Sequence, residues 1–497
     1  ELARLFHEQW SWDQLATVCG VLEREPGGAD PTTAARCAAA AFARRDLAGA
    51  AAGMRAVPGL ADMSVIAAAW AGATATDRVA DIAGTIDVDG DGTRELYLYD
   101  LTPAPGRLDI VRADASLTPL RRYTLTSRLA DRQGVKPLSL GPGEPALLLT
   151  WSGEHRRVAL SAADDSRLTE LLTVPADEPL AATAADLDRD GAPEIYLGTG
   201  PYGRQLLSLR REPRGTWQIG QPHPGTDATN SDINAIVAAD LDGDGRDELA
   251  VAAGAWRAFD VRVLRPGAEP GKLELVARRK LGDVAALAIL RGPADERLLV
   301  AAKTDAYPSR VAFSSEAPAG PPAGLYFLRL RGGDLEVARF LPAPRRRSGE
   351  HPLAQVQLHV GDVDGDGLED LVVRALEPDP APPQAVIYRQ RADGSFASSM
   401  ITGIVPLALA DLDDDPALEL VARAVGPGES SLWLLGVGDA PMPPLPAAHA
   451  AAAPPPPDLT DPPLVRAWHR AEQLAGLGLS QEAARAHDDL ASLLVDP

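Results

Sequence analysis

One pattern of acidic residues recurs five times along this chain and constrains its fold more than any other feature. Each copy has Asp at positions 1, 3 and 5 and an acid at position 9. The acids are Asp87, Asp89, Asp91 and Glu95; Asp186, Asp188, Asp190 and Glu194; Asp240, Asp242, Asp244 and Glu248; Asp362, Asp364, Asp366 and Asp370; and Asp411, Asp413, Asp415 and Glu419. Four carboxylates held so close together repel one another unless a cation neutralises them.

The spacing of these acids is suited to calcium. Ca²⁺ takes six to eight oxygen ligands at about 2.3–2.6 Å, and four carboxylates in one loop supply most of them. The backbone carbonyl of position 7 can add another ligand, and any residue offers a carbonyl. Position 7 accordingly varies, and is Thr93, Ala192, Arg246, Leu368 or Ala417. The sequence therefore predicts up to five bound calcium ions.

Two of the five loops depart from the common pattern. Position 6 is glycine in four loops, where a sharp turn leaves no room for a Cβ, but it is Pro416 in the fifth. Because proline cannot adopt a positive φ, occupancy of the Asp411 loop is left open. The second loop keeps Gly191 but has Pro193 at position 8.

The loops also account for most of the chain's charge. The chain has 48 Lys and Arg against 70 Asp and Glu, a formal net charge of −22, and the five loops hold twenty of the acids. This balance argues against nucleic-acid binding, which needs basic patches. The sequence also has no run of about 18 apolar residues, so we expect no membrane insertion by this chain.

An EF-hand is the main alternative to a turn between strands. It needs a glutamate at position 12 and a helix on each side. Position 12 is apolar in every loop, as Leu98, Leu197, Val251, Val373 or Ala422. Apolar residues alternate after position 9, as at Leu249 and Val251, and a period of two predicts a strand. Acidic Asp-Gly turns are common in hairpins without a metal, but five copies with the same four acids favour calcium.

The spacing of the loops indicates a repeat of about fifty residues. First aspartates fall at 87, 186, 240, 362 and 411, and the two long gaps each contain a copy without the aspartates, at 135–151 and 285–302. Seven repeats of several short strands predict a mainly β fold, a seven-bladed β-propeller over residues 79–440. In the fourth repeat we expect strands at 233–239, 248–253, 259–264 and 273–278.

The calcium loops and the strands after them resemble the FG-GAP/VCBS repeats of integrin-α-like propellers. The resemblance rests on the loops together with segments such as Ile195-Tyr-Leu197-Gly-Thr-Gly200 and Leu249-Ala-Val251-Ala-Ala-Gly254. It covers residues 79–440, although the Phe-Gly and Gly-Ala-Pro dipeptides of that family are poorly kept. It implies a calcium-stabilised propeller used in adhesion, assembly or sensing, sometimes beside a catalytic domain.

Helical patterns flank the predicted propeller. Residues 1–78 are rich in Ala with apolar residues at helical spacing, and residues 463–497 form two predicted helices. Both flanks are similar to tetratricopeptide (TPR) units, and the alternative is capping helices without a peptide-binding role. Residues 441–462 are a Pro/Ala linker. Cys19 and Cys37 lie in the first flank, and whether they pair is left open.

The loops between the second and third strands of each blade are expected on the face opposite the calcium loops. Large residues favoured at binding hot spots gather there in blades two to five. They are Trp151, Tyr202, Arg204, Trp256, Arg257, Tyr307 and Arg310. We hypothesise a protein partner at this face, with packing at the top of the ring as the alternative.

The sequence favours a binding or scaffold module in which calcium is structural, and not an enzyme. The eight histidines are scattered, and no glycine-rich loop ends in Lys-Ser or Lys-Thr. One alternative is the sensor or scaffold arm of a larger signalling or enzyme protein, favoured by a start at Glu1 without Met and a TPR-like unit that stops at the last residue. Another is an enzyme acting on carbohydrate or lipid. Composition indicates a bacterial gene, and calcium use favours an extracytoplasmic location.

Overall fold

The computed structural model has one compact unit at residues 1–445 and a second at 446–497. It describes residues 3, 11–22, 30–44, 46–60, 63–68, 81–86, 95–100, 106–112, 119–125, 133–140, 147–152, 157–163, 167–174, 178–200, 205–223, 232–254, 258–293, 295–304, 321–342, 355–376, 384–412, 415–424 and 432–437. The predicted linker at 441–462 and helices at 463–497 lie outside these residues. No helix in the described part is long and apolar enough to cross a membrane.

Three described helices precede the sheets: α2 (Trp12–Leu22), α3 (Pro31–Ala43) and α4 (Leu47–Arg55). Asp30 caps α3, since its carboxylate accepts the backbone N–H of Thr32 at 3.0 Å and of Thr33 at 3.2 Å, with Pro31 at the first helical position. Asp46 caps α4 in the same way through the N–H of Gly49, at 3.0 Å. The side-chain caps set where these two helices begin.

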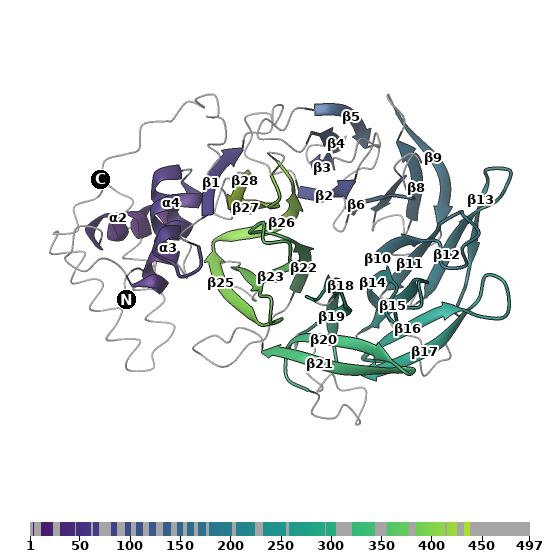
Figure 1. The fold of residues 1–497 in the computed structure, drawn as a ribbon. Coiled ribbons are helices and arrows are strands. Elements are labelled where there is room, and N and C mark those ends of the chain that lie inside the picture. The colour runs from purple at the N-terminus through teal and green to yellow at the C-terminus, as the bar shows by residue number, and fades with distance from the viewer. Residues whose placement is uncertain are drawn as a thin grey trace, which may run out of the picture. The chain divides into compact units, whose positions relative to one another are not determined.

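Seven four-stranded antiparallel sheets form the blades of a β-propeller (Figure 1). Blades 1 and 2 consist of β2 (Asp81–Ile86), β3 (Glu95–Asp100), β4 (Gly106–Val111) and β5 (Pro119–Leu125), then β6 (Gln133–Leu138), β7 (Leu147–Ser152), β8 (Arg157–Ala163) and β9 (Leu168–Val174). Blades 3 and 4 consist of β10 (Glu178–Ala185), β11 (Glu194–Gly200), β12 (Leu206–Arg211) and β13 (Trp217–Gly220), then β14 (Ile233–Ala239), β15 (Glu248–Ala253), β16 (Asp260–Pro266) and β17 (Leu273–Lys280).

The remaining blades complete the set of seven. Blade 5 consists of β18 (Val284–Arg291), β19 (Arg297–Lys303), β20 (Gly324–Arg331) and β21 (Asp334–Pro342), and blade 6 of β22 (Gln355–Gly361), β23 (Asp370–Leu376), β24 (Gln384–Gln390) and β25 (Phe396–Thr402). Blade 7 consists of β26 (Ile404–Ala410), β27 (Glu419–Ala424), β28 (Leu432–Val437) and β1 (Met63–Ala68). The first strands of successive blades contact one another, from β2 and β6 round to β22, β26 and β2 again. The expected seven-bladed, mainly β fold is therefore confirmed.

The blades follow the predicted repeat closely. In blade 4 the strands begin and end within two residues of their predicted bounds. The two copies without aspartates also form complete blades. The segment predicted at 135–151 corresponds to β6 and β7, and the segment predicted at 285–302 corresponds to β18 and β19. Buried apolar runs, such as Leu147–Leu149 in β7 and Leu299–Ala302 in β19, therefore maintain the blade architecture where the acidic loops are missing.

The ring is closed by a strand from the N-terminal side of the chain. β1 pairs antiparallel with β28, with Met63 opposite Val437 and Ala68 opposite Leu432, and forms the outer strand of blade 7. The boundary at residue 78 was therefore wrong for this segment, because residues 63–68 form a strand and not part of a helical flank. Without β1, the outer edge of β28 would present unpaired backbone groups.

Helices α3 and α4 pack on blades 6 and 7. Phe42 of α3 and Trp433 of β28 are both fully buried, and their rings meet edge to face with centroids 5.0 Å apart. Met54 of α4 and Ile401 of β25 belong to the same apolar cluster. Such aromatic contacts contribute beyond the area they bury. The helices thus share a core with the propeller.

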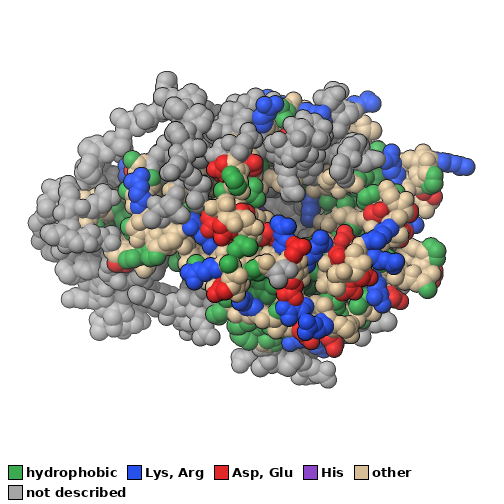
Figure 2. All heavy atoms as spheres, viewed as in Figure 1, with side chains coloured by type: hydrophobic (Ala, Val, Ile, Leu, Met, Phe, Trp, Pro, Cys, Tyr) green, Lys and Arg blue, Asp and Glu red, His purple; other side chains and the backbone are tan. Residues whose placement is uncertain are grey.

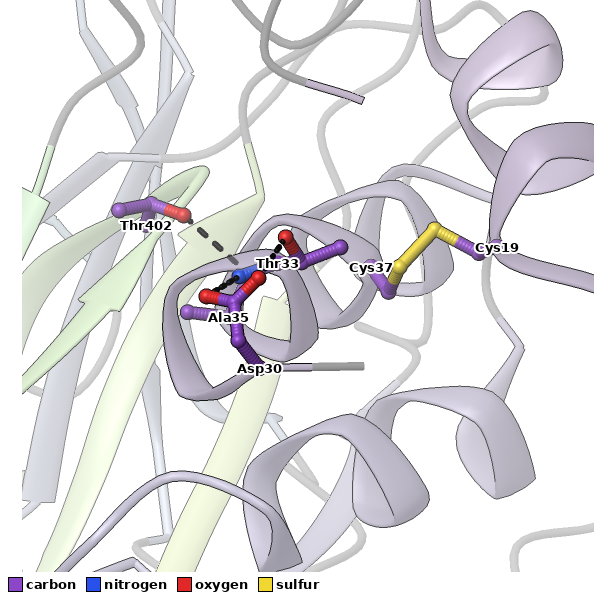
Figure 3. The surroundings of a disulfide bond; sticks show 6 residues. All are labelled: Cys19, Asp30, Thr33, Ala35, Cys37 and Thr402. Carbon is purple, nitrogen blue, oxygen red and sulfur yellow. Dashed lines mark hydrogen bonds between the residues drawn. A yellow bond between two sulfur atoms is a disulfide. The ribbon is translucent and has the colours of Figure 1, made fainter. Parts of the chain in front are cut away.

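A disulfide joins Cys19 of α2 to Cys37 of α3 (Figure 3), with the two Cα atoms 5.7 Å apart. The question of pairing, open from the sequence, is settled by this bond. Two residues before Cys37 in α3, the carbonyl of Ala35 accepts the Thr402 hydroxyl at 3.4 Å, which connects the helix to β25. The disulfide therefore secures α2 to a helix that is itself attached to blade 6.

Replacing both cysteines by serine should lower the free energy of unfolding of the helical region by about 3 kcal/mol, because the bond closes a loop with a sequence separation of 18 residues. Thermal unfolding of wild type and of Cys19→Ser/Cys37→Ser, each with and without reductant, measures the difference. Reductant should lower the melting temperature of wild type only. An equal melting temperature for oxidised wild type and the variant would contradict the stabilising role.

Candidate metal centres

The acidic loops occupy the same place in their blades. Residues 186–194 connect β10 to β11, 240–248 connect β14 to β15, and 362–370 connect β22 to β23, in each case joining the first strand to the second. The loops at 87–95 and 411–419 join β2 to β3 and β26 to β27. Since first strands line the centre of the ring, the loops lie at one end of the innermost strand pair, as predicted for hairpin turns.

Three of the loops bring carboxylates together in the geometry of a cation site. The groups are Asp186, Asp188 and Asp190; Asp240, Asp242 and Glu248; and Asp362, Asp364 and Asp370. Within each group one oxygen per residue lies within 4.8 Å of the others. Sequence positions 1, 3 and either 5 or 9 therefore do converge, and the donors are all oxygen.

The first aspartate of the loop accepts hydrogen bonds from backbone N–H groups further along the same loop. Asp240 accepts the N–H of Gly243 at 2.8 Å and of Gly245 at 3.0 Å, and Asp362 accepts those of Gly365 and Gly367 at 2.7 Å each. At position 6, Gly245 and Gly367 have φ of 82° and 85°, in the region that favours glycine. The backbone conformation therefore favours glycine at this position, but the expected lack of room for a Cβ was wrong, since a Cβ on Gly367 would meet no atom within 4 Å beyond its two chain neighbours.

The ninth position ties the loop to the blade core. Glu248, Asp370 and Glu419 are 2%, 0% and 1% exposed. Each accepts the N–H of loop position 2, from Leu241 at 2.8 Å, Val363 at 3.0 Å and Leu412 at 2.7 Å. Each of these acids therefore ties the start of its loop to the start of the second strand.

Burial makes these acids costly to ionise. It raises the pKa of Glu248 to about 7 and that of Asp370 to about 7, and the negative charges of the loop aspartates add to both shifts. A cation among the carboxylates would favour their charged forms. A bound metal ion would therefore relieve the repulsion among these carboxylates.

The residues present fit a hard cation such as Ca²⁺. Oδ1 of Asp364 is buried and has no hydrogen-bond partner, and Asp364 belongs to the cluster with Asp362 and Asp370. An unsatisfied carboxylate oxygen costs free energy unless it meets a donor or a metal. All-oxygen donors suit Ca²⁺ and Mg²⁺ rather than zinc, and a flexible loop with several carboxylates suits Ca²⁺.

The remaining predicted ligands are only partly described by the structure. Asp87, Asp89, Asp91, Thr93 and Asp413 lie outside the described residues, whereas Glu95 is buried at the start of β3. Asp244, Asp366 and Asp415 accept the N–H of position 7, from Arg246 at 2.8 Å, Leu368 at 2.9 Å and Ala417 at 2.7 Å. The position-7 carbonyls, that of Ala192 included, stay predicted ligands. Whether the Asp411 loop binds an ion also stays open.

The predicted partner residues are not placed by the structure. Tyr202, Arg204, Trp256, Arg257, Tyr307 and Arg310 lie outside the described residues. Trp151 lies in β7 opposite Val158, but nothing is described of its side chain. The partner face therefore stays a hypothesis.

Sequence analysis missed one residue of the second loop. Arg210 on β12 donates from Nε to Glu194 at 2.9 Å and from Nη2 to the same oxygen at 2.6 Å, and it also pairs with Asp188. Glu194 is absent from the cluster of that loop. The only sign of this contact in the sequence is an arginine in the third strand. The acid that it faces is known only when the register of the second and third strands is known.

An FG-GAP-like repeat model matches residues 186–251, which run from the second calcium loop into β15. The chain thus contains an FG-GAP-like repeat within a seven-bladed propeller, as the resemblance implied. The TPR-like character of the flanks stays a prediction. A comparison with curated proteins finds no match.

Many solved structures share a general likeness to the chain. One is hydrazine synthase of Kuenenia stuttgartiensis, at 12% identity and a TM-score of 0.44, covering 73% of this chain and 98% of that one. A rhamnogalacturonan lyase has 16% identity and a TM-score of 0.41, with 75% and 76% covered, and a Lactobacillus plantarum protein has 13% and 0.41, with 72% and 96%. At such low similarity we draw nothing about function from them.

Replacing Asp364 by Asn should affect stability differently with and without calcium. In EDTA the melting temperature should stay equal or rise, since repulsion with Asp362 and Asp366 decreases. In calcium, binding at this loop should weaken about tenfold or more, because one charged ligand is lost. Calorimetric titration and thermal unfolding measure the two effects.

Asp393 offers a matched control in the same blade. It lies in the turn between β24 and β25, where it accepts the N–H of Ser395 at 2.8 Å, and it is not a member of the cluster. Asp393→Asn should leave the calcium-dependent rise in melting temperature as in wild type. An equal loss of that rise in both variants would show that Asp364 has no special role as a ligand.

Proposed function

We propose that this chain is a calcium-stabilised propeller that acts as a protein-interaction or scaffold module. The observation that carries the proposal is the convergence of carboxylates in three equivalent loops, two of which include a buried acid and one of which has a partnerless buried oxygen. In this proposal Asp240, Asp242 and Glu248 hold one ion, and Asp362, Asp364 and Asp370 another. When bound, calcium supplies positive charge that joins the two innermost strands of a blade.

The position of the loops favours a structural role for the ion over a catalytic one. The ninth acid begins the second strand and also accepts a hydrogen bond from the backbone of position 2. A metal ion bound to this acid would therefore act on the blade core. Each candidate cluster in the described part of the chain consists of carboxylates alone. A metal surrounded by protein oxygens keeps no open position for an activated water. We therefore propose that the chain is not an enzyme.

A protein partner suits the surface better than a nucleic acid does. On the face shown in Figure 2, acidic and basic side chains are intermixed over the described blades. The formal net charge of −22 would repel a polyanion. The ring of blades also gives a rigid platform whose loops can vary without changing the core.

We also propose an extracytoplasmic location. The Cys19–Cys37 disulfide is of the kind that persists in oxidising compartments. Calcium is abundant outside the cytoplasm, where modules with affinities of about 0.1–1 mM are filled. The two features are independent and favour the same compartment.

Calcium should raise the melting temperature of the metal-stripped protein, whereas magnesium should raise it much less. At a free concentration one hundred times the dissociation constant, each site adds about 2.7 kcal/mol to the free energy of unfolding. Thermal unfolding in EDTA and then across a calcium titration measures the effect. Elemental analysis must first show that the starting protein is metal-free, and a flat titration of such protein would contradict the proposal.

Alanine at Trp256 and at Tyr307 should weaken binding of the native partner if the face opposite the calcium loops is the interaction surface, because large aromatic residues supply much of the binding energy at such surfaces. Affinity capture with the whole chain, compared between wild type and the double variant at equal melting temperature, measures this. Retention of every partner by the double variant would remove this face from the proposal.

A further inference from the structure

A basic side chain contacts one of the three acidic clusters. Arg210 contacts Asp188, a member of the cluster at 186–194, and Glu194, the ninth acid of the same loop. Its Nε and Nη2 both donate to Oε1 of Glu194, at 2.9 and 2.6 Å. The other oxygen of Glu194 accepts the Tyr196 hydroxyl at 3.3 Å. A single guanidinium thus joins two of the four predicted calcium ligands.

Arginines at the matching position of two other blades are arranged differently. Strand register places Arg265 beside Glu248 and Arg389 beside Asp370, as it places Arg210 beside Glu194. Arg265 instead pairs with Glu274 on the neighbouring strand, at 3.1 Å. Arg389 Nε is 3.8 Å from Asp364, beyond hydrogen-bond distance.

The ninth acids of these two blades bond the backbone. Glu248 accepts the N–H of Leu241, and Asp370 accepts those of Val363 and Gln390. Both acids belong to their clusters, whereas Glu194 does not. The loops at 240–248 and 362–370 therefore keep the ninth acid within the candidate cation site.

Blade 5 shows that an arginine can balance the ninth acid where the aspartates are missing. Its short turn at 292–296 ends in Glu296, directly before β19. Arg329 of β20 lies opposite Leu298 in the strand register, two residues along from Glu296, and donates both Nε and Nη2 to Glu296, the second at 2.7 Å. In this blade the second and third strands are joined by an arginine and a carboxylate.

We propose that Arg210 is a built-in cation that competes with calcium for the loop at 186–194. The inference rests on the proposed function, that these loops bind calcium. Carboxylate oxygens engaged by the guanidinium are not available to the metal, and the two positive charges repel each other. The side chain of Arg210 is 39% exposed, so it can turn toward solvent when calcium enters.

The competition distinguishes the loop at 186–194 from the loop at 240–248. The loop at 240–248, where Arg265 pairs with Glu274, binds calcium more tightly, and the loop at 186–194 binds it weakly, with Arg210 joining the strands until calcium is abundant. The blade consequently has a counter-charge at every calcium concentration, but the source of that charge changes. The loop at 186–194 responds only when calcium is plentiful.

Arg210→Gln tests the proposal in the whole chain. Calcium affinity at this loop should rise about tenfold in the variant, as expected when an opposing cation is removed from a cluster of carboxylates. In EDTA the melting temperature should fall, because the loop then has no counter-charge. Equilibrium dialysis against calcium and thermal unfolding measure the two effects, and the gain in affinity must disappear in Arg210→Gln/Asp190→Asn.

Arg265→Gln is the matched control, since Arg265 has the same register but contacts Glu274 and not the loop acids. It should leave the calcium isotherm as in wild type. Arg210→Lys keeps the charge without the two-pronged contact, so its affinity should lie between those of wild type and Arg210→Gln. It also tests the proposal if the glutamine variant does not fold.

The outcomes separate this inference from the proposed function. Calcium binding in wild type that neither substitution at Arg210 strengthens would overturn the competition and leave the calcium sites intact. Weaker binding in Arg210→Gln would do the same, because Arg210 would then support the site. No calcium binding by the metal-stripped wild type would overturn the proposed function itself.

Discussion

Repulsion among carboxylates at the turn between the two innermost strands is the constraint that each acidic blade must resolve. The blades resolve it locally, with backbone N–H groups, glycines of positive φ and, in blade 3, a guanidinium. Hydrogen bonds to the first aspartate shape the loop, but they do not remove the charge of the other three acids. Neutralisation by a cation is therefore coupled to the packing of the blade, since the ninth acid begins a strand of the core.

The blades without these loops show what the loops add. Blades 2 and 5 have the same four strands and bury apolar side chains in the core clusters, so the acidic turns are not needed for the architecture. Burial of apolar side chains between neighbouring sheets holds the ring together. Cations bound at the candidate sites would accordingly adjust the stability of individual blades within a fold that hydrophobic packing defines.

Much of this structure follows from local pattern. The period-two alternation and the repeat length predicted the blades, including the two without aspartates, and the spacing of the acids predicted which loops would gather carboxylates. Features that depend on contacts between distant segments did not follow. β1 pairs with a strand more than three hundred residues later, and no local signal in residues 63–68 identifies that partner. The contact between Arg210 and Glu194 depends on the register of β11 and β12, and the pairing of Cys19 with Cys37 depends on how α2 meets α3.

Closure by β1 has a consequence for the order of events during synthesis. The strand leaves the ribosome before any complete blade, yet its partner β28 is among the last propeller strands to be made. Until then β1 is a largely apolar strand without its native neighbour, the kind of segment that pairs wrongly in a growing chain. Helices α3 and α4 contact each other and are short-range structures that can form at once, and α4 contacts β1. The contact between α4 and β1 joins neighbours in sequence, so it can form before β28 is made, whereas the pairing that closes the ring cannot.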